Sequence, residues 1–112
     1  MNEPVIDSEV FDEMRELLED SLGDFINTYF ENSPKLIENI SKALPKGDLE
    51  AVYMNAHQLK GGSGSIGAAE VFRLANQMEE KARLGDESDL DALLGEMKSA
   101  YDQVVTELKA HL

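Results

Sequence analysis

The stretch LEAVYMNAHQLKGGSGSIGA, residues 49–68, decides between two fold classes. Its segment GSGSIG, residues 62–67, has the G-x-G-x-x-G spacing of a nucleotide-binding loop. Such a loop needs a strand before it and a helix directly after it, because amides at the helix N-terminus hold the phosphates. The preceding residues instead carry apolar side chains at helical spacing, and Lys60 comes before the glycines, against the order of a Walker loop. The stretch therefore predicts a helix, with Asp48 as its N-cap.

This helix has two faces when its residues are placed about 100° apart. One broad stripe is apolar and should face the core: Leu49, Val52, Ala56, Leu59, Ser63 and Ile66. His57 lies well off that stripe, with Gly61 and Gly64 on its side of the helix and Lys60 between this side and the core. We therefore expect the imidazole to lie beside a strip of nearly bare backbone.

Helical periodicity also dominates the rest of the chain, and no stretch shows the alternation of a strand. We expect helices over residues 8–20, 22–44, 48–66, 68–84 and 88–110, with Asp7 or Ser8 capping the first and Ser88 preceding the last. Pro34 predicts a kink or the local loss of one backbone hydrogen bond, with a full break as the alternative. The pattern indicates an all-α fold, an antiparallel up-down-up-down four-helix bundle with a short extra N-terminal helix packed across one end.

Composition limits the partners that this chain can have. With 112 residues we expect one domain over residues 1–112 and at most one site. The net charge of −13 opposes binding to nucleic acid and to anionic membrane surfaces. The chain contains no cysteine, no secretory leader and no apolar run long enough to cross a membrane, so we expect a cytoplasmic protein.

His57 is the candidate reactive residue. A lone histidine on a helix is usually only a polar surface residue, but a neutral imidazole can also attack phosphorus and form a transferable N-phosphoryl group. Lys60, one turn away, can place an ammonium near the phosphoryl oxygens. Residues 51–78 carry a net charge of +1, which would admit a partner with an acidic pocket.

The glycines near His57 have two interpretations. Each glycine inside a helix costs about 1 kcal/mol relative to alanine, so something should compensate. Gly62 and Gly67 suit close helix packing and helix termination. Gly61 and Gly64 lie on a side that looks solvated, and there they would give a second protein room to approach.

The run His57-Gln58-Leu59-Lys60-Gly61-Gly62-Ser63, followed by Ile66-Gly67-Ala68, resembles the motif of histidine-containing phosphotransfer (HPt) domains. The family pattern Ala-His-x-Leu-Lys-Gly-x-Ser, with an aliphatic-Gly-Ala end, is met at each position. Gly64 is an additional glycine at a position that the pattern leaves open. The helix layout is similar too, since the family is a four-helix bundle with a short N-terminal helix.

The resemblance implies a phosphorelay intermediate rather than an enzyme with its own kinase activity. His57 would accept a phosphoryl group from a receiver-domain aspartyl phosphate and pass it to another receiver, with Lys60 assisting at the phosphoryl group. The expected partners are the receiver domains of hybrid sensor kinases and response regulators, with Gly61, Gly64, Met54 and Gln58 at the docking surface. No intrinsic cofactor or metal is expected, and magnesium would belong to the receiver.

The residues are also compatible with two alternatives. The chain could be a helical adaptor that binds receivers without being phosphorylated, or a phosphoacceptor module excised from a histidine kinase. We expect a free-standing monomer.

The remaining polar residues have simpler interpretations. His111, near the end of the chain, has no histidine one helical turn away with which to hold a metal. The many acidic residues, including the run Met78-Glu79-Glu80, are interpreted as a solvated surface beside an apolar stripe.

Overall fold

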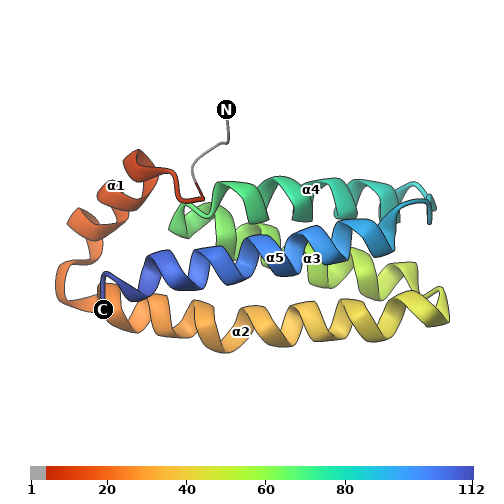
Figure 1. Cartoon of the computed structure of the whole chain (residues 1–112), viewed down its shortest axis with the longest axis horizontal. Helices are drawn as coiled ribbons and strands as arrows, with labels where there is room; N and C mark the ends of the chain where they lie inside the picture. Colours follow the sequence, from red (N-terminus) through yellow and green to blue (C-terminus); the bar gives the residue numbers. More distant parts are fainter. Residues whose placement is uncertain (1–4) are drawn as a thin grey trace.

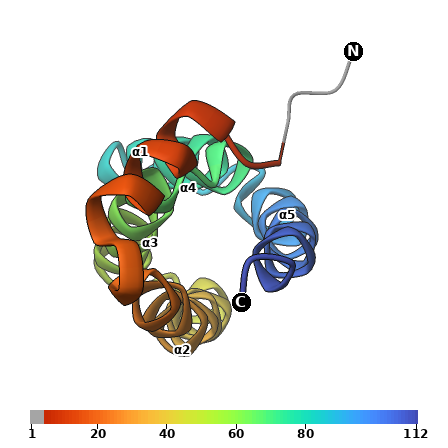
Figure 2. The same cartoon turned by 90° about the vertical axis from the view of Figure 1, so that its left-hand side faces the viewer.

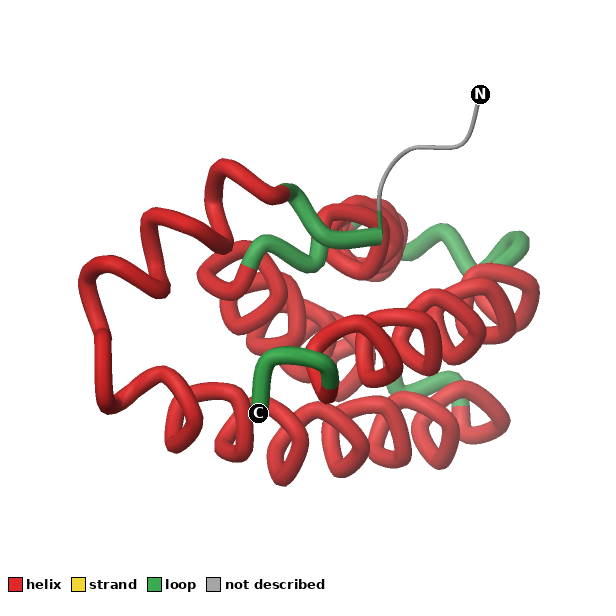
Figure 3. The backbone as a smooth tube through the Cα atoms, turned by 60° about the vertical axis from the view of Figure 1, so that its left-hand side comes forward, coloured by secondary structure: helices red, strands yellow, loops and turns green. Residues whose placement is uncertain are grey.

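The computed structural model describes residues 5–112, and the regular elements within them are all helical (Figure 3). The α-helices are α1 (Ser8–Leu18), α2 (Leu22–Ala43), α3 (Leu49–Ile66), α4 (Ala69–Arg83) and α5 (Leu90–Lys109). Single 3-10 turns, Glu19–Ser21 and Leu44–Lys46, follow α1 and α2. The all-α prediction is confirmed.

The four long helices surround a common core, and each contacts its neighbour in the order α2, α3, α4, α5, with α5 closing against α2 (Figure 2). Figure 1 shows α2 leading away from the end that carries α1, α3 returning beside it, α4 leading away again and α5 returning. The short connections between consecutive helices favour this arrangement of neighbours. As a result, residues near the middle of α3 lie beside residues near the middle of α4.

The core is built from the apolar stripe of each long helix. On α3 the predicted stripe is buried from Val52 to Ile66, while Leu49 is half-buried at the helix start. Ser63 is the polar member of this stripe, and its Oγ hydrogen-bonds the Tyr29 hydroxyl of α2 at 2.8 Å. Burial raises the pKa of Tyr29 well above its ordinary value, so the hydroxyl stays protonated and can take part in this bond.

The short helix α1 is fastened across the end of α3. Asp7 caps α1 by accepting hydrogen bonds from the backbone of Glu9 and Val10, and its own N–H donates to the Gly67 carbonyl at 2.7 Å. Gly67 ends α3 in the left-handed region at φ 83°, and a Cβ there would lie 3.0 Å from the Asp7 carbonyl oxygen. The predicted helix-terminating role of Gly67 is confirmed, because only glycine fits both conditions.

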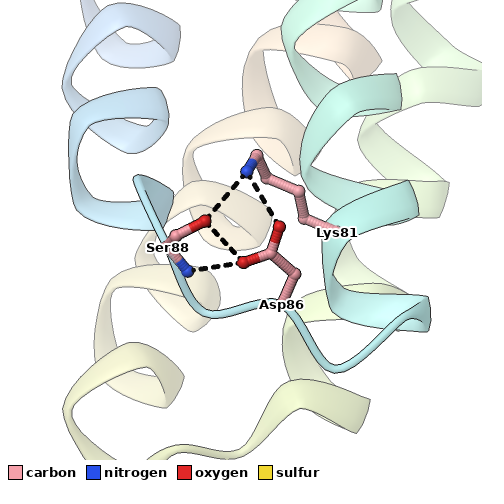
Figure 4. A network of polar contacts seen from close by, with 3 residues as sticks. All are labelled: Lys81, Asp86 and Ser88. Carbon is pink, nitrogen blue, oxygen red and sulfur yellow. Dashed lines mark hydrogen bonds and ion pairs between the residues drawn. The ribbon is translucent and has the colours of Figure 1, made fainter.

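Each predicted helix is present, with bounds that differ from the prediction by at most two residues. α2 continues across Pro34, which excludes a full break there. α5 begins at Leu90 and not at residue 88, because Ser88 belongs to the preceding connection: its backbone N–H donates to Asp86 Oδ1, and Lys81 Nζ lies 3.2 Å from both Asp86 Oδ2 and Ser88 Oγ (Figure 4). The last helix therefore follows Ser88, and it begins two residues after the predicted bound at residue 88.

Candidate functional site

His57 projects from the middle of α3 and meets Glu79 of α4. Its Nδ1 atom lies 2.7 Å from Glu79 Oε1, while 60% of its side chain remains exposed. Because an ionised carboxylate can only accept a hydrogen bond, Nδ1 carries the proton in this pair. In a neutral imidazole, Nε2 then holds the free lone pair.

Lys60 completes a cluster around the same buried carboxylate. Its ammonium lies 2.6 Å from Glu79 Oε2, so the two oxygens of Glu79 are shared between His57 and Lys60. Burial on its own would raise the pKa of Glu79, but the hydrogen bonds and charges of Lys60 and His57 outweigh it and lower that pKa below its ordinary value. The carboxylate is therefore ionised at neutral pH, and we call these three residues the Glu79 cluster.

Tyr53 flanks the imidazole on α3 itself. It lies one helical turn before His57, and the two ring planes are 9° apart with centroids separated by 6.1 Å. The tyrosine ring is half-buried and packs against the core. The imidazole thus has Glu79 at one edge and an aromatic ring at its side.

The glycines after His57 have three different surroundings. At Gly61 a Cβ would meet nothing within 4 Å, as expected for an open strip. At Gly62 it would touch the Tyr29 ring at 3.6 Å, an ordinary packing contact. At Gly64 it would lie 3.0 Å from the Phe72 ring of α4, so the prediction that Gly64 belongs to the open strip was wrong; the absence of a side chain there makes room for Phe72.

The other two residues expected at a docking surface are exposed beside His57. Met54 is 52% exposed, one turn before Gln58 on α3. Gln58 lines a groove between α2 and α3, whose walls include Phe25 and Leu36. Gln58 and Gly61 both lie on α3, within about one turn after His57.

Glu79 is the site residue that the sequence analysis missed. It was counted with the solvated acidic residues, but the side chain is only 10% exposed and joins His57 to Lys60. The feature of the sequence that pointed to burial of Glu79 was its position beside Met78 on α4. The sequence does not tell which neighbouring helix Glu79 faces, because that depends on how the helices pack. Adding Glu79 also brings the charge of residues 51–79 to zero, so the predicted positive region is neutral once this carboxylate is included.

The remaining polar groups add no second centre to the described part of the chain. His111 lies against Phe11, with ring centroids 4.5 Å apart. Among residues 5–112, no three histidine, aspartate or glutamate side chains gather where they could hold a metal ion. No helix described here is both long and apolar enough to cross a bilayer.

Comparisons with known proteins agree with this geometry. Histidine-containing phosphotransfer protein 4 of Arabidopsis thaliana is 36% identical over 84 residues, which cover 70% of this chain and 66% of that relative, just under two thirds of its length. The crystal structure of histidine-containing phosphotransfer protein B from Pseudomonas aeruginosa superposes with a TM-score of 0.93 at 28% identity, covering 98% of this chain and 96% of that one. A phosphotransfer protein from Medicago truncatula shares the fold, with a TM-score of 0.83 at 24% identity over 95% of this chain and 76% of its own.

The family itself is settled by a match along the long helices. Residues 24–107, which run from α2 into α5 and include the Glu79 cluster, match the Hpt domain. The chain therefore belongs to the Hpt family, the histidine-containing phosphotransfer modules of two-component phosphorelays.

Proposed function

We propose that this chain is a phosphorelay intermediate in which Nε2 of His57 accepts a phosphoryl group from the aspartyl phosphate of one receiver domain and passes it to the aspartate of another. The observation that carries the proposal is the contact of Nδ1 with the ionised Glu79, 2.7 Å away, on a side chain that is otherwise 60% exposed. This contact leaves Nε2 as the nucleophile and leaves it accessible to a second protein.

The transfer step balances without an external acid or base. The Nε2 lone pair attacks phosphorus, an N–P bond forms, and the P–O bond to the receiver's carboxyl group breaks, so that the carboxylate leaves with the electron pair. The imidazole becomes a phosphorylated imidazolium that keeps its proton on Nδ1. Glu79 faces this proton, and its negative charge stabilises the positive ring as it forms.

Lys60 supports the same step by charge. Its ammonium is held beside the imidazole through their shared partner, Glu79. A cation there offsets part of the charge on the phosphoryl oxygens during transfer. The chain itself would need no metal or nucleotide, since the magnesium and the acidic pocket of such a reaction belong to the receiver.

The partner would approach over the exposed surface around His57. Gly61 offers backbone with no side chain in the way, and Met54 and Gln58 supply exposed contact area on the same helix. Receiver domains of hybrid sensor kinases and of response regulators are the partners that this chemistry requires, because they carry the aspartyl phosphate.

The direct test is to mix the chain with a radiolabelled phosphorylated receiver and follow the label. We expect label that is labile in acid and stable in alkali, and we expect none when magnesium and ATP are supplied without a kinase. His57→Ala should remove the label, whereas the matched variant His111→Ala should keep it. Label that persists in His57→Ala would defeat the proposal, and the absence of label across a panel of receivers would favour a non-phosphorylated adaptor.

Clearance at Gly61 gives a second test. Gly61→Gln should slow transfer by obstructing the receiver, while helix content stays the same or rises slightly. Gly95→Gln is the matched control, because Gly95 is also a helical glycine whose Cβ would meet nothing within 4 Å. Equal transfer rates for the two variants would show that Gly61 is not needed for docking.

A further inference from the structure

The contact between Nδ1 and Glu79 does not fully fix the direction in which Nε2 of His57 points. The hydrogen bond tolerates a range of distances and angles, and within that range small rotations about χ1 and χ2 of the exposed side chain still move Nε2. In-line attack needs Nε2, phosphorus and the leaving oxygen to be aligned, so the direction in which Nε2 points affects the rate. Something besides Glu79 must limit these rotations if the exposed ring is to be preorganised.

Tyr53 is placed to do this. Its ring runs nearly parallel to the imidazole, with a 9° angle between planes and 6.1 Å between centroids, which is the geometry of an offset stack. Both residues lie on α3, one turn apart, so the spacing does not depend on how two helices pack. The tyrosine ring is itself half-buried against the core. It therefore moves less than an exposed side chain would, and it can restrict the motion of the imidazole beside it.

We propose that Tyr53 is a positioning residue for phosphoryl transfer, its ring orienting the His57 imidazole so that Nε2 faces the incoming receiver. The inference rests on the proposed function and adds a residue to it. Tyr53 acts through the ring face and not through its hydroxyl. Phenylalanine at position 53 should therefore keep the imidazole oriented, whereas leucine should not.

The experiment compares Tyr53→Phe and Tyr53→Leu with the wild-type chain and with Phe30→Leu, which removes another half-buried ring, on α2, and leaves the stack in place. The first readout is the NMR signal of the His57 ring protons in the unphosphorylated protein. In Tyr53→Leu these protons should lose the ring-current shift of the neighbouring tyrosine. In Tyr53→Phe and Phe30→Leu the shift should persist.

The second readout is single-turnover transfer from a phosphorylated receiver, with the receiver concentration varied. Loss of the stack in Tyr53→Leu should lower the maximal rate about threefold to tenfold, the range that corresponds to an aromatic pair. The half-saturating receiver concentration should change less than about twofold, because docking is kept. Tyr53→Phe should stay within about twofold of the wild-type maximal rate, since the ring face remains.

A small phosphodonor separates orientation from the reactivity of the nitrogen. Phosphoramidate, whose P–N bond breaks as Nε2 attacks, can approach from any direction. It should therefore phosphorylate Tyr53→Leu at close to the wild-type rate.

Four results would overturn the inference. A wild-type maximal rate in Tyr53→Leu, or an equal loss in Phe30→Leu, would show that the stack does not position His57. A change confined to the half-saturating concentration would assign Tyr53 to docking. Failure of the wild-type chain to be labelled by any receiver or by phosphoramidate would overturn the proposed function and this inference with it.

Discussion

Two polar clusters each include one residue from the C-terminal half of α4, Glu79 in one and Lys81 in the other, and each holds one carboxylate against a lysine. In the Glu79 cluster the carboxylate is 10% exposed, and both of its partners come from another helix, α3. In the second cluster, Lys81–Asp86–Ser88, the carboxylate is 45% exposed and all members lie within eight residues of each other in the chain (Figure 4). A carboxylate paired with a lysine therefore has two different roles here: the second cluster shapes a turn, and the first holds the His57 ring.

The two clusters differ because their carboxylates differ in exposure to water, and not because of the residue types they contain. A charge shielded from water interacts more strongly with its neighbours than an exposed one. Removing a member of the Glu79 cluster should therefore affect both chemistry and stability, whereas removing a member of the Asp86 cluster should affect only the local turn.

The largest effect is expected at Glu79 itself. Glu79→Ala should lower the rate of phosphoryl transfer to His57, because Nδ1 loses its charged acceptor and the imidazolium loses its counter-ion. A hydrogen bond to a charged group contributes about 1.5–3 kcal/mol, which corresponds to about tenfold to hundredfold in rate. Stopped-flow or quench-flow transfer from a phosphorylated receiver measures it.

Asp86→Asn is the matched control for the loss of transfer rate in Glu79→Ala, because it alters the carboxylate of the second cluster. Its transfer rate should equal that of the wild-type chain. If Glu79→Ala transferred as fast as Asp86→Asn, the two clusters would have equivalent effects on transfer. The claim that only the Glu79 cluster supports the chemistry would then be wrong.

A smaller effect on stability is expected at Lys60. Lys60→Met keeps the alkyl stem but leaves the buried Glu79 without its cation, which should lower the free energy of unfolding by about 1–3 kcal/mol at pH 7. The pKa of Glu79 is lowered by its partners, so its contribution is present at neutral pH and is lost as pH falls through that lowered value. The difference between variant and wild type should therefore shrink in acid, where Glu79 is protonated in both.

Denaturant unfolding at pH 7 and in the acid range measures this dependence. Lys42→Met is the control, because Lys42 pairs with Glu38 at an exposed position, 3.6 Å apart, and should contribute less than about 1 kcal/mol. Equal losses in the two variants, or a loss at Lys60 that does not depend on pH, would argue against a buried ionised Glu79.

The smallest effect is expected at Asp86. Hydrogen bonds from the side chain and backbone of Ser88, and then from Lys81, lower the pKa of Asp86 to about 2. Asp86→Asn should therefore lower the melting temperature slightly at pH 7, with the difference fading as pH falls through about 2 and the wild-type carboxylate is protonated. Thermal scans across this pH range measure it, and a difference that persists at the acid end would show that the ionised carboxylate is not what holds the turn.

Much of this arrangement could be predicted from the sequence because it depends on local spacing. The stripe from Val52 to Ile66, the caps at Asp7 and Asp48 and the termination at Gly67 each follow from a residue type at a helical position. The exposed placement of His57 followed from the same periodicity.

The errors came from contacts between helices. Glu79 and Phe72 both lie on α4, and only the packing of α4 against α3 brings the first to His57 and the second over Gly64. Periodicity tells which face of a helix is apolar, but it does not tell which residue of the next helix stands opposite. The start of the last helix at Leu90, two residues after the predicted bound at 88, has a local cause: the backbone N–H and the hydroxyl of Ser88 both donate to Asp86 in the preceding turn.

The central claim is that Glu79 holds Nδ1 of His57 and leaves Nε2 to carry the phosphoryl group. Nitrogen-15 and phosphorus-31 NMR of the phosphorylated chain, with histidine labelled at its ring nitrogens, tests this most directly. The account predicts a phosphorus–nitrogen coupling at Nε2 of His57 and a protonated Nδ1. A phosphoryl group on Nδ1, or on any residue other than His57, would contradict it.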